Sequence, residues 1–464
     1  KLEAYFKNPE NKEYFNGDHQ AVLLPDTDLP ADLSVQEMRE ACRALKGGIL
    51  RQEIYTEDGT TKSDVPYSVS ERSYKLSHLQ PHGPNLHAVF FSHPSETIDY
   101  HYERNTADPR ISHALTLAVD DYGNVLKSVA IGYQRRKPAF DEQQQTLATL
   151  TENGYTNPVL EVDAYRTPLL AEAKTYELTT PLLKDTKPLD FETVITLVTT
   201  ATEINYEAKS ANGQTQKRLI EHVRSLYRKN DLSGLLPLSH LESMALPGES
   251  YKLAFTPELL DVYQSKMPRT QLTALLKGIE GGYRDLDGNG LLWIPSGLIF
   301  CSSNTGDNPQ QELAFARAHF FLPHRFQDPF VNNTLVTYDN KYNLLMVSTR
   351  DAVGNETKAE QDYRVLQPRL VTDPNNNRTE VRFDALGMVV GTAVMGKAAG
   401  LIEGDSFANF VADLTQADIK NFFDSTDPRS IGIGYLGTAS TCIVYDLERI
   451  PVCAAAIARE THVS

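Results

Sequence analysis

Hydrophobic positions along this chain mostly alternate with polar ones, which is the pattern of half-buried β-strands. Residues 379–383 (TEVRF) alternate between charged side chains and side chains suited to a covered face, as a strand with one side in solvent requires. In residues 125–133, Val129 and Ile131 share one face, opposite Ala130. Residues 218–228 fit either the strand or the helix period, and we interpret them as a strand. The pattern predicts a mainly β chain with helices as inserts.

Helical signals are fewer and come with clear start residues. Ser34 and Glu37 form a capping box, because a hydroxyl and a carboxylate at this spacing satisfy the first amides of a helix. Apolar residues follow at helical spacing, and Gly47 ends the run. We therefore expect a helix near residues 34–46. Further helices are expected in the following ranges: 256–260, 271–279, 310–319 and 415–423.

A repeated turn is the most informative feature of the sequence. An aspartate is followed after two residues by glycine or a substitute, and then usually by asparagine. Two copies are complete and lie far apart in the chain: Asp120, Gly123 and Asn124, and Asp351, Gly354 and Asn355. Partial copies begin at Asp339, Asp373 and Asp384, the last with Gly387.

The spacing of these aspartates indicates a true repeat. Asp339 and Asp351 are 12 residues apart, and Asp351, Asp362, Asp373 and Asp384 follow at steps of 11. A step of this length is one strand of roughly 5–6 residues plus its connection, so two steps make a hairpin.

The turn residues fit this interpretation chemically. An aspartate side chain accepts hydrogen bonds from backbone amides two residues on, and glycine or asparagine tolerates the positive φ of tight hairpins. Tyr338 and Phe383 directly precede two of the aspartates. We expect them to pack as cross-strand aromatics. An isolated hairpin is marginally stable in water, so the repeat predicts a continuous, coiled antiparallel sheet.

These motifs resemble the YD repeats of the Rhs type, and longer stretches resemble the B component of bacterial insecticidal toxin complexes. The resemblance to the B component rests on long segments that extend to the end of the chain: Asp285–Gly297, Ala318–Phe326, Val371–Val381, Phe383–Val394 and Ile457–Ser464. It divides the chain into a β-rich region, residues 1–111, and a YD-repeat shell segment, residues 112–464, with the clearest repeats in 338–395.

The resemblance implies a structural role. In that family, the early part of the B chain docks on a pore-forming A subunit, and its later part winds into the wall of a hollow shell. A C component completes the shell and leaves its cleaved toxic region inside. The implied partners of this chain are therefore a C component and, through other parts of the protein, an A-type pore. The implied location is secreted, without direct membrane insertion, and no catalytic residue is expected.

One departure favours the B component over the C component. C components and stand-alone Rhs toxins carry an aspartyl autoprotease segment, usually with a DPxG-aromatic sequence. None of the four Asp-Pro pairs of this chain is followed by that pattern: Asp108-Pro109, Asp328-Pro329, Asp373-Pro374 and Asp427-Pro428. Self-cleavage is therefore not expected.

Composition narrows the function further. The net charge is −16, which repels phosphate backbones and argues against nucleic acid and anionic lipid as partners. The longest apolar stretches are far shorter than the roughly 18 residues of a membrane helix. Four scattered cysteines do not suggest a disulfide scaffold. The chain begins with Lys1 and has no signal-peptide pattern. The simplest interpretation is a fragment of a longer protein.

Candidate chemical sites are few. Asp285, Asp287 and Asn289 occupy ligand positions of a calcium loop, but Ser296 replaces the bidentate glutamate. A tight turn is the favoured interpretation. Residues 391–397 (GTAVMGK) lack the hydroxyl that follows the lysine of a phosphate-binding loop. Residues 432–437 read GxGxxG, but a strand-like segment follows. We expect no metal and no cofactor.

Histidines also cluster in one region, without the spacing of a zinc site. They are His78, His82, His87, His93 and His101. Another pair, His319 and His324, flanks aromatic residues, and packing is the expected role. Two alternatives to the toxin-complex shell stay open: an Rhs-type shell of another toxin system, and a β-rich carbohydrate-active enzyme or adhesin.

Overall fold

The computed structural model describes residues 14–184, 187–398 and 403–463, which form two compact units. The first unit comprises residues up to Asn230 together with Gly234–Ser296. The second comprises Asp231–Ser233 and residues from Gly297 onward. Lys1 and Ser464, the first and last residues of the sequence, lie outside the described residues. The expected division between residues 111 and 112 concerned the extent of the repeat, and it stays a prediction.

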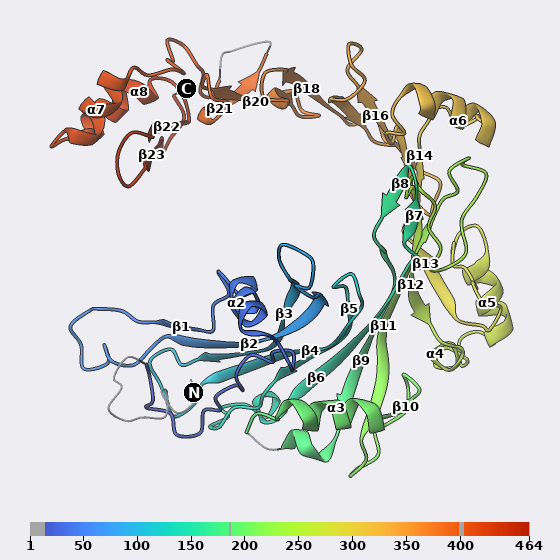
Figure 1. The fold of residues 1–464 in the computed structure, drawn as a ribbon. Coiled ribbons are helices and arrows are strands. Elements are labelled where there is room, and N and C mark those ends of the chain that lie inside the picture. The colour runs from blue at the N-terminus through green and yellow to red at the C-terminus, as the bar shows by residue number, and fades with distance from the viewer. Residues whose placement is uncertain (1–13, 185–186, 399–402, 464) are drawn as a thin grey trace. The chain divides into compact units, whose positions relative to one another are not determined.

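The first unit is built on one large sheet, shown in Figure 1. Its strands pair in the order β1-β2-β3-β4-β5-β6-β9-β11-β12-β13, and β10 adds to β11. Every pair along this path is antiparallel, and β10 runs parallel to β11. The bounds are β1 Arg51–Ile54, β2 Ser68–Gln80, β3 Val89–His101, β4 Arg110–Val119, β5 Val125–Gly132, β6 Leu147–Tyr155, β9 Leu170–Thr179, β10 Thr202–Ile204, β11 Gln216–Tyr227, β12 Pro247–Phe255 and β13 Leu292–Pro295.

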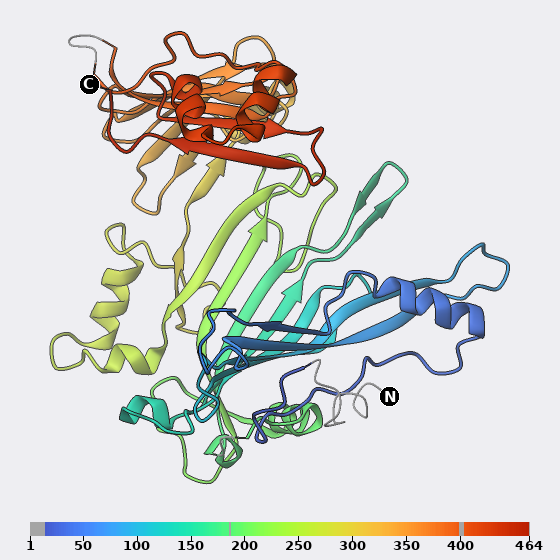
Figure 2. The same ribbon diagram turned by 90° about the vertical axis from the view of Figure 1, so that its left-hand side faces the viewer.

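Helices and a hairpin surround this sheet. Helix α2 (Val35–Ala44) lies beside the ends of β2 and β3, as Figure 2 shows. A separate hairpin of β7 (Val159–Glu161) and β8 (Ala164–Arg166) projects between β6 and β9. The other helices of this unit are α3 (Phe191–Thr200), α4 (Pro257–Asp261) and α5 (Arg269–Lys277).

The core of the first unit lies on one face of its sheet. Alternate residues of β3 to β9 are buried there, including Ile98, Leu115 and Leu150. Helix α3 covers this face with Val194 and Leu197, which are 0 and 3 % exposed. Burial of these alternate positions follows from the strand period, and their removal from water is the main stabilising term.

The second unit is a meander in which each strand pairs with its neighbours in sequence. The pairing order is β14 to β23 without a crossover. The bounds are β14 Leu298–Phe300, β15 Arg325–Gln327, β16 Asn333–Tyr338, β17 Met346–Arg350, β18 Glu356–Asp362, β19 Gln367–Thr372, β20 Asn377–Phe383, β21 Val389–Lys397, β22 Thr441–Asp446 and β23 Cys453–Ala458. Its helices are α6 Pro309–Ala318, α7 Gln416–Asp424 and α8 Pro428–Leu436.

The fold class expected from the sequence is confirmed: both units are mainly β and antiparallel, with short helical inserts. The capping box of Ser34 and Glu37 is present at the start of α2, and residues 218–228 fall largely within β11. Helices α3 and α8 were not expected. Within the described residues, no helix is long and apolar enough to cross a membrane.

Candidate functional site

The sequence repeat forms the turns between consecutive strands of the second unit. Between β15 and β21, an aspartate stands at the start of every connection. It is the first residue after the strand, except for Asp362, which is the last residue of β18. Because neighbouring strands are antiparallel, these turns alternate between the two ends of the strands. We call these two rows of turns the two turn edges of the sheet. One edge carries the turns that begin at Asp328, Asp351 and Asp373. The other edge carries those at Asp339, Asp362 and Asp384.

The turn at Asp351 shows how a complete repeat works. Asp351 Oδ1 accepts hydrogen bonds from the amides of Val353 (3.0 Å) and Asn355 (2.8 Å). The side-chain amide of Asn355 donates to Oδ2 at 2.8 Å. Gly354 has φ +92°, a region that glycine enters without a steric penalty. The carboxylate therefore closes the turn from inside.

The copy in the first unit has the same geometry. Asp120 Oδ1 accepts from the amides of Tyr122 (2.9 Å) and Asn124 (2.8 Å). Asn124 Nδ2 donates to Oδ2 at 3.0 Å, and Gly123 has φ +83°. This turn joins β4 to β5, so the repeat chemistry serves the sheets of both units.

A further copy at Asp328 was missed in the sequence. Asp328 Oδ1 accepts from the amides of Phe330 (2.9 Å) and Asn332 (2.8 Å), and Asn332 Nδ2 donates to Oδ2 at 3.0 Å. Two signals could have identified it. Asp328 lies 11 residues before Asp339, and asparagine stands four positions after it. Val331, with φ +68°, takes the place of the glycine and hides the pattern.

At the edge that carries the turns of Asp328, Asp351 and Asp373, asparagine side chains favour the charged form of the aspartates. The hydrogen bond from Asn355 lowers the pKa of Asp351, and the side chains of Asn377 and Asn332 do the same for Asp373 and Asp328. A hydrogen bond to the ionised carboxylate favours that form.

The turn at Asp339 is longer than the others. Its backbone amide donates to Leu345 O at 2.8 Å, whereas the Asp351 amide donates to residue 355. The longer turn accompanies the single 12-residue step of the repeat. Burial opposes ionisation of Asp339, but hydrogen bonds from the amides of Leu345, Leu344 and Tyr342 outweigh it and lower the pKa of Asp339 to about 2.

Turns on this second edge are bonded to one another. Tyr363, in the turn after Asp362, donates its hydroxyl to Asp339 Oδ2 at 3.2 Å and packs against Tyr342 at 5.6 Å. Arg364 of the same turn donates to the backbone oxygen of Asp384 at 3.3 Å. These contacts connect the three turns that lie next to each other on this edge, those at Asp339, Asp362 and Asp384.

The two aromatics that precede repeat aspartates occupy different surroundings. Tyr338 donates its hydroxyl to Pro323 O at 3.1 Å, and its ring lies 4.9 Å from that of His324. Phe383 is opposite Val389 in the register of β20 and β21. Their role as cross-strand aromatics stays a prediction.

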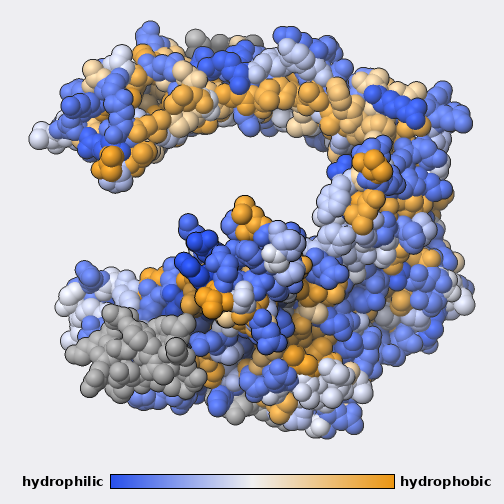
Figure 3. All heavy atoms as spheres, in the orientation of Figure 1, coloured by the Kyte–Doolittle hydropathy of each residue, from blue (hydrophilic) through white to orange (hydrophobic). Residues whose placement is uncertain are grey.

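The sheet of the second unit has two chemically different faces. The register aligns Glu360, Leu370 and Glu380 on one face, with charged neighbours such as Lys358 and Arg378. The opposite face carries a row of Ala359, Val371, Thr379 and Val394. Figure 3 shows hydrophobic residues in a stripe along one side of this unit.

The helices of this unit leave the less polar face uncovered. The second unit has a core of its own, in which Cys442 and Val444 of β22 and Ile457 of β23 pack with α7 and α8. Cys442 is paired with Gly391, which lies on the charged face of the earlier strands, so the helices cover that side. On the other side, Val394 is 46 % exposed.

In the first unit, the face opposite the core carries residues that are either small or polar. A row that runs across the register consists of Thr97, Ala114, Ala130, Thr149 and Glu177. Ala114 and Ala130 are exposed, although they lie between buried neighbours. Each unit therefore presents one broad sheet face to its surroundings.

Asp285, Asp287 and Asn289, the candidate calcium ligands, each contact a different partner. Asp287 accepts two hydrogen bonds from Arg224 Nη1, at 3.0 and 2.8 Å, and Asp285 lies 3.6 Å from Lys277 Nζ. Asn289 Oδ1 accepts the amide of Leu291, and Gly288 and Gly290 have positive φ. In the described part of the chain, no three His, Cys, Asp or Glu side chains are grouped to hold a metal ion.

The remaining motifs of the sequence are parts of the fold. Residues 391–397 lie in β21, and Gly432 and Gly434 lie inside α8, so neither forms a phosphate-binding loop. Among the clustered histidines, His87 pairs with Glu40 of α2 at 3.0 Å and His78 stacks on Phe90. His319 and His324 pack around Phe315.

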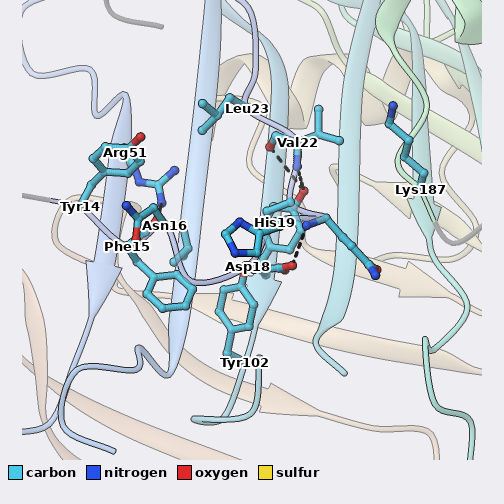
Figure 4. A pocket seen from close by; sticks show the side chains of 14 residues that line it. Tyr14, Phe15, Asn16, Asp18, His19, Val22, Leu23, Arg51, Tyr102 and Lys187 are labelled. Atoms are coloured by element: carbon cyan, nitrogen blue, oxygen red, sulfur yellow. Dashed lines mark hydrogen bonds between the residues drawn. The ribbon is translucent and has the colours of Figure 1, made fainter. Parts of the chain in front are cut away.

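A cavity of about 780 Å³ lies between the N-terminal segment and the sheet of the first unit, as Figure 4 shows. Two of its charged residues, Asp18 and Arg51, are bonded to neighbouring side chains. Asp18 accepts from Arg136 Nη1 (2.9 Å) and from the hydroxyl of Tyr102 (3.0 Å). Arg51 is held by Glu53 at 2.6 Å and by Glu71. Arg51 Nη2 also donates to Phe15 O at 3.2 Å, so Asp18 and Arg51 fasten the segment to the sheet.

Comparisons with known proteins agree with the motifs. A sequence model of the family described as "Insecticide toxin TcdB middle/C-terminal region" matches residues 40–169. More than half of the matched residues precede Ser112, where the motifs gave no specific signal. Comparison with curated proteins gave no match.

Solved structures resemble the chain over almost its whole length. The crystal structure of TcdB2–TccC3 has 22 % identity and a TM-score of 0.58, covering 95 % of this chain and 21 % of that one. The complex with Cdc42 gives a TM-score of 0.57 at the same identity and coverage. The Tc holotoxin pore of Photorhabdus luminescens gives 0.58 at 22 % identity, covering 95 % and 20 %. This chain thus spans about a fifth of those chains, and the expected resemblance to the B component is confirmed.

Proposed function

We propose that this chain is a non-catalytic wall segment of a secreted, tripartite toxin complex. In this proposal the wall encloses the toxic C-terminal region of a C component, and the protein hands that region to an A-type pore. The observation that carries the proposal is the likeness in fold to TcdB2–TccC3 along 95 % of the chain.

The chemistry of the sheets supports a wall rather than an enzyme. A meander whose turns bond to each other extends by adding strands, and each strand depends on its neighbours for stability. A broad, partly apolar face marks a surface that meets another chain or an enclosed volume. In the cavity beside the N-terminal segment, Asp18 is paired with Arg136 and Arg51 with Glu53, contacts that hold the segment in place.

Protease protection of the C component tests the proposal. The full-length protein that contains this chain is co-expressed with its C component, and the C-terminal region of the latter is followed during limited proteolysis. We expect that region to survive in the complex and to be degraded when the C component is expressed alone.

Electron microscopy of the same particles provides the second measurement. A closed cavity bounded by sheets is expected. Particles without such a cavity, or a C-terminal region that is cut equally fast with and without this protein, would contradict the proposal.

A further inference from the structure

A pocket of about 300 Å³ lies in the second unit, beside the turn at Asp384. Its walls come from the β20–β21 turn, the segment before α7, α7 itself, and β22 with the turn that follows it. Figure 1 shows α7 next to β22. An apolar cavity of roughly 150 Å³ is large enough to bind benzene, so this pocket has room for one ring with a short substituent.

The floor of the pocket is apolar and removed from water. Val390, Cys442 and Val444 line the pocket and are 6, 3 and 1 % exposed. Burial raises the pKa of the Cys442 thiol to about 11, so the thiol is neutral at physiological pH. An ion on this floor would lose its hydration without gaining a partner. The floor therefore favours an uncharged group.

Aromatic and sulfur-containing side chains also line the pocket. Phe410 and Met388 stand in its walls. The Phe410 ring packs edge-on against Phe407, with 4.9 Å between the ring centres, and this contact holds it in place. Aromatic rings attract one another in edge-to-face arrangements, and thioether and thiol sulfur make favourable contacts with rings. The lining therefore favours an aromatic ring over a saturated ring of the same size.

Hydrogen bonds fix the distances between the walls. Asp413, in the segment before α7, accepts the amide of Ala385 in the β20–β21 turn at 2.7 Å. Tyr445 of β22 donates its hydroxyl to Val389 O of β21 at 2.9 Å. Because each bond joins two different walls, the pocket is formed before any ligand enters.

The residues at the mouth of the pocket are exposed. Three large apolar ones are 72, 58 and 48 % exposed: Leu386, Val411 and Leu447. A ligand that covers them would remove further apolar surface from water. The charged residues of the lining are all carboxylates: Asp384, Asp413 and Glu448. No lysine, arginine or histidine is among the described residues that line the pocket, so an anionic ligand would be repelled.

From this geometry we infer that the pocket binds a small uncharged aromatic molecule, one ring that carries a short polar substituent. The ring lies on the apolar floor, and the substituent reaches the water and the carboxylates at the mouth. The volume exceeds that of a single ring, which favours a free molecule over the aromatic side chain of a partner protein. This site goes beyond the wall function proposed above, because it requires no second chain.

Ligand-observed NMR titration of the 464-residue chain with phenol tests the inference. We expect a Kd on the order of 1 mM, which is typical of a ligand with so few heavy atoms. Cyclohexanol has the same size and hydroxyl group but no aromatic electrons, and it should bind at least about threefold more weakly. Benzoate, the anionic probe, should show no binding.

Two substitutions that fill the pocket locate the binding. Ala412→Phe should abolish binding of phenol, and Ala385→Phe, at an exposed position of the lining, should weaken it at least about tenfold. Ala417→Phe, at an exposed position of α7 outside the lining, makes the same substitution and should bind phenol like the wild type. Circular dichroism checks the fold of each variant.

Four results would overturn the inference. They are the failure of phenol to bind, equal binding of phenol and cyclohexanol, unchanged phenol binding in both filling variants, and tighter binding of Nα-acetyl-phenylalaninamide than of phenol. The last result would assign the pocket to an aromatic side chain of a polypeptide instead of a free molecule.

Discussion

Single residues in the repeat turns combine two requirements, a backbone conformation and room for a neighbour. Gly354 and Gly387 have nearly the same φ, +92° and +84°. A Cβ on Gly354 would meet nothing nearer than Arg350 Nη2 at 3.7 Å, whereas a Cβ on Gly387 would lie 2.9 Å from Val365 Cγ1. The two positions therefore separate the conformational cost of a side chain from its packing cost.

We predict that Gly354→Ala lowers the free energy of unfolding of the second unit by about 1–2 kcal/mol, the cost of a left-handed conformation for a residue with Cβ. Gly387→Ala should lower it further, by about 1 kcal/mol or more, because Val365 must shift. Urea denaturation followed by circular dichroism measures both values.

Val365→Ala provides the control for this comparison. In the Gly387→Ala background it should recover most of the difference between the two glycine variants, because it removes the methyl group that the new Cβ meets. Equal losses in Gly354→Ala and Gly387→Ala, with no recovery, would mean that turn-to-turn packing does not matter at this edge.

At the scale of elements, the tip of the long β2–β3 hairpin is held to helix α2 by carboxylates. Glu40 Oε2 accepts the amide of Ala88 at 2.8 Å, and its Oε1 lies 3.0 Å from His87 Nδ1. Glu37 accepts the amide of His82 at 3.0 Å. Hydrogen bonds from Ala88 and His87 lower the pKa of Glu40 to about 2. Glu40, which holds the hairpin tip to α2, is therefore fully ionised at neutral pH.

We predict that Glu40→Ala releases this tip. Hydrogen exchange of residues 82–89 should become on the order of tenfold faster, since two hydrogen bonds to a charged group are lost. Exchange in the buried strands β4 and β5 should not change. Arg39→Ala, an exposed neighbour on the same helix, is the matched control and should exchange like the wild type. Unchanged exchange in Glu40→Ala would show that the tip is held by its own turn.

Sequence reasoning succeeded for elements whose ends carry their own chemistry. The capping box at Ser34 marks the start of α2 correctly, and the helix expected over 415–423 is α7, because the hydrogen bonds that start a helix are local. Helix α3 was missed because its sequence, FETVITLVTT, is rich in β-branched residues that favour strands. Burial of Val194 and Leu197 against the sheet outweighs this preference, and no local pattern reports such tertiary contacts.

The candidate site could likewise be predicted from the sequence only in part. The aspartate turns follow from residue spacing. Which turns share an edge follows from antiparallel pairing, but the contact of Tyr363 with Asp339 spans 24 residues and requires the fold.

At the scale of the whole molecule, the response to acid follows from carboxylates and histidines of both units, which lose their stabilising contribution in different pH ranges. The pKa values of Glu37, Glu40, Glu172 and Asp339 are held to about 2. Such carboxylates stabilise the fold above their unfolded pKa of about 4, and this contribution is lost as the pH falls from about 4 toward 2.

Buried histidines act in a higher pH range. Burial lowers the pKa of His93, His222 and His324. Since the unfolded chain binds protons more readily at these positions, their contribution is present above about pH 6.5 and is lost as the pH falls through the folded pKa. Stability should therefore fall in two stages, first below pH 6.5 and then, more steeply, below pH 4.

Trp293 allows this prediction to be measured for the first unit. It is the single tryptophan of the chain, it is fully buried, and its ring lies 4.7 Å from that of His222. The urea midpoint from its fluorescence should decrease from pH 7.5 to 5, and the decrease should be smaller in His222→Gln than in the exposed control His240→Gln. All three proteins should lose stability steeply below pH 4. A midpoint that rises between pH 7.5 and 5 would mean that Glu172, 2.7 Å from His222 Nε2, stabilises the protonated imidazole more than burial disfavours it.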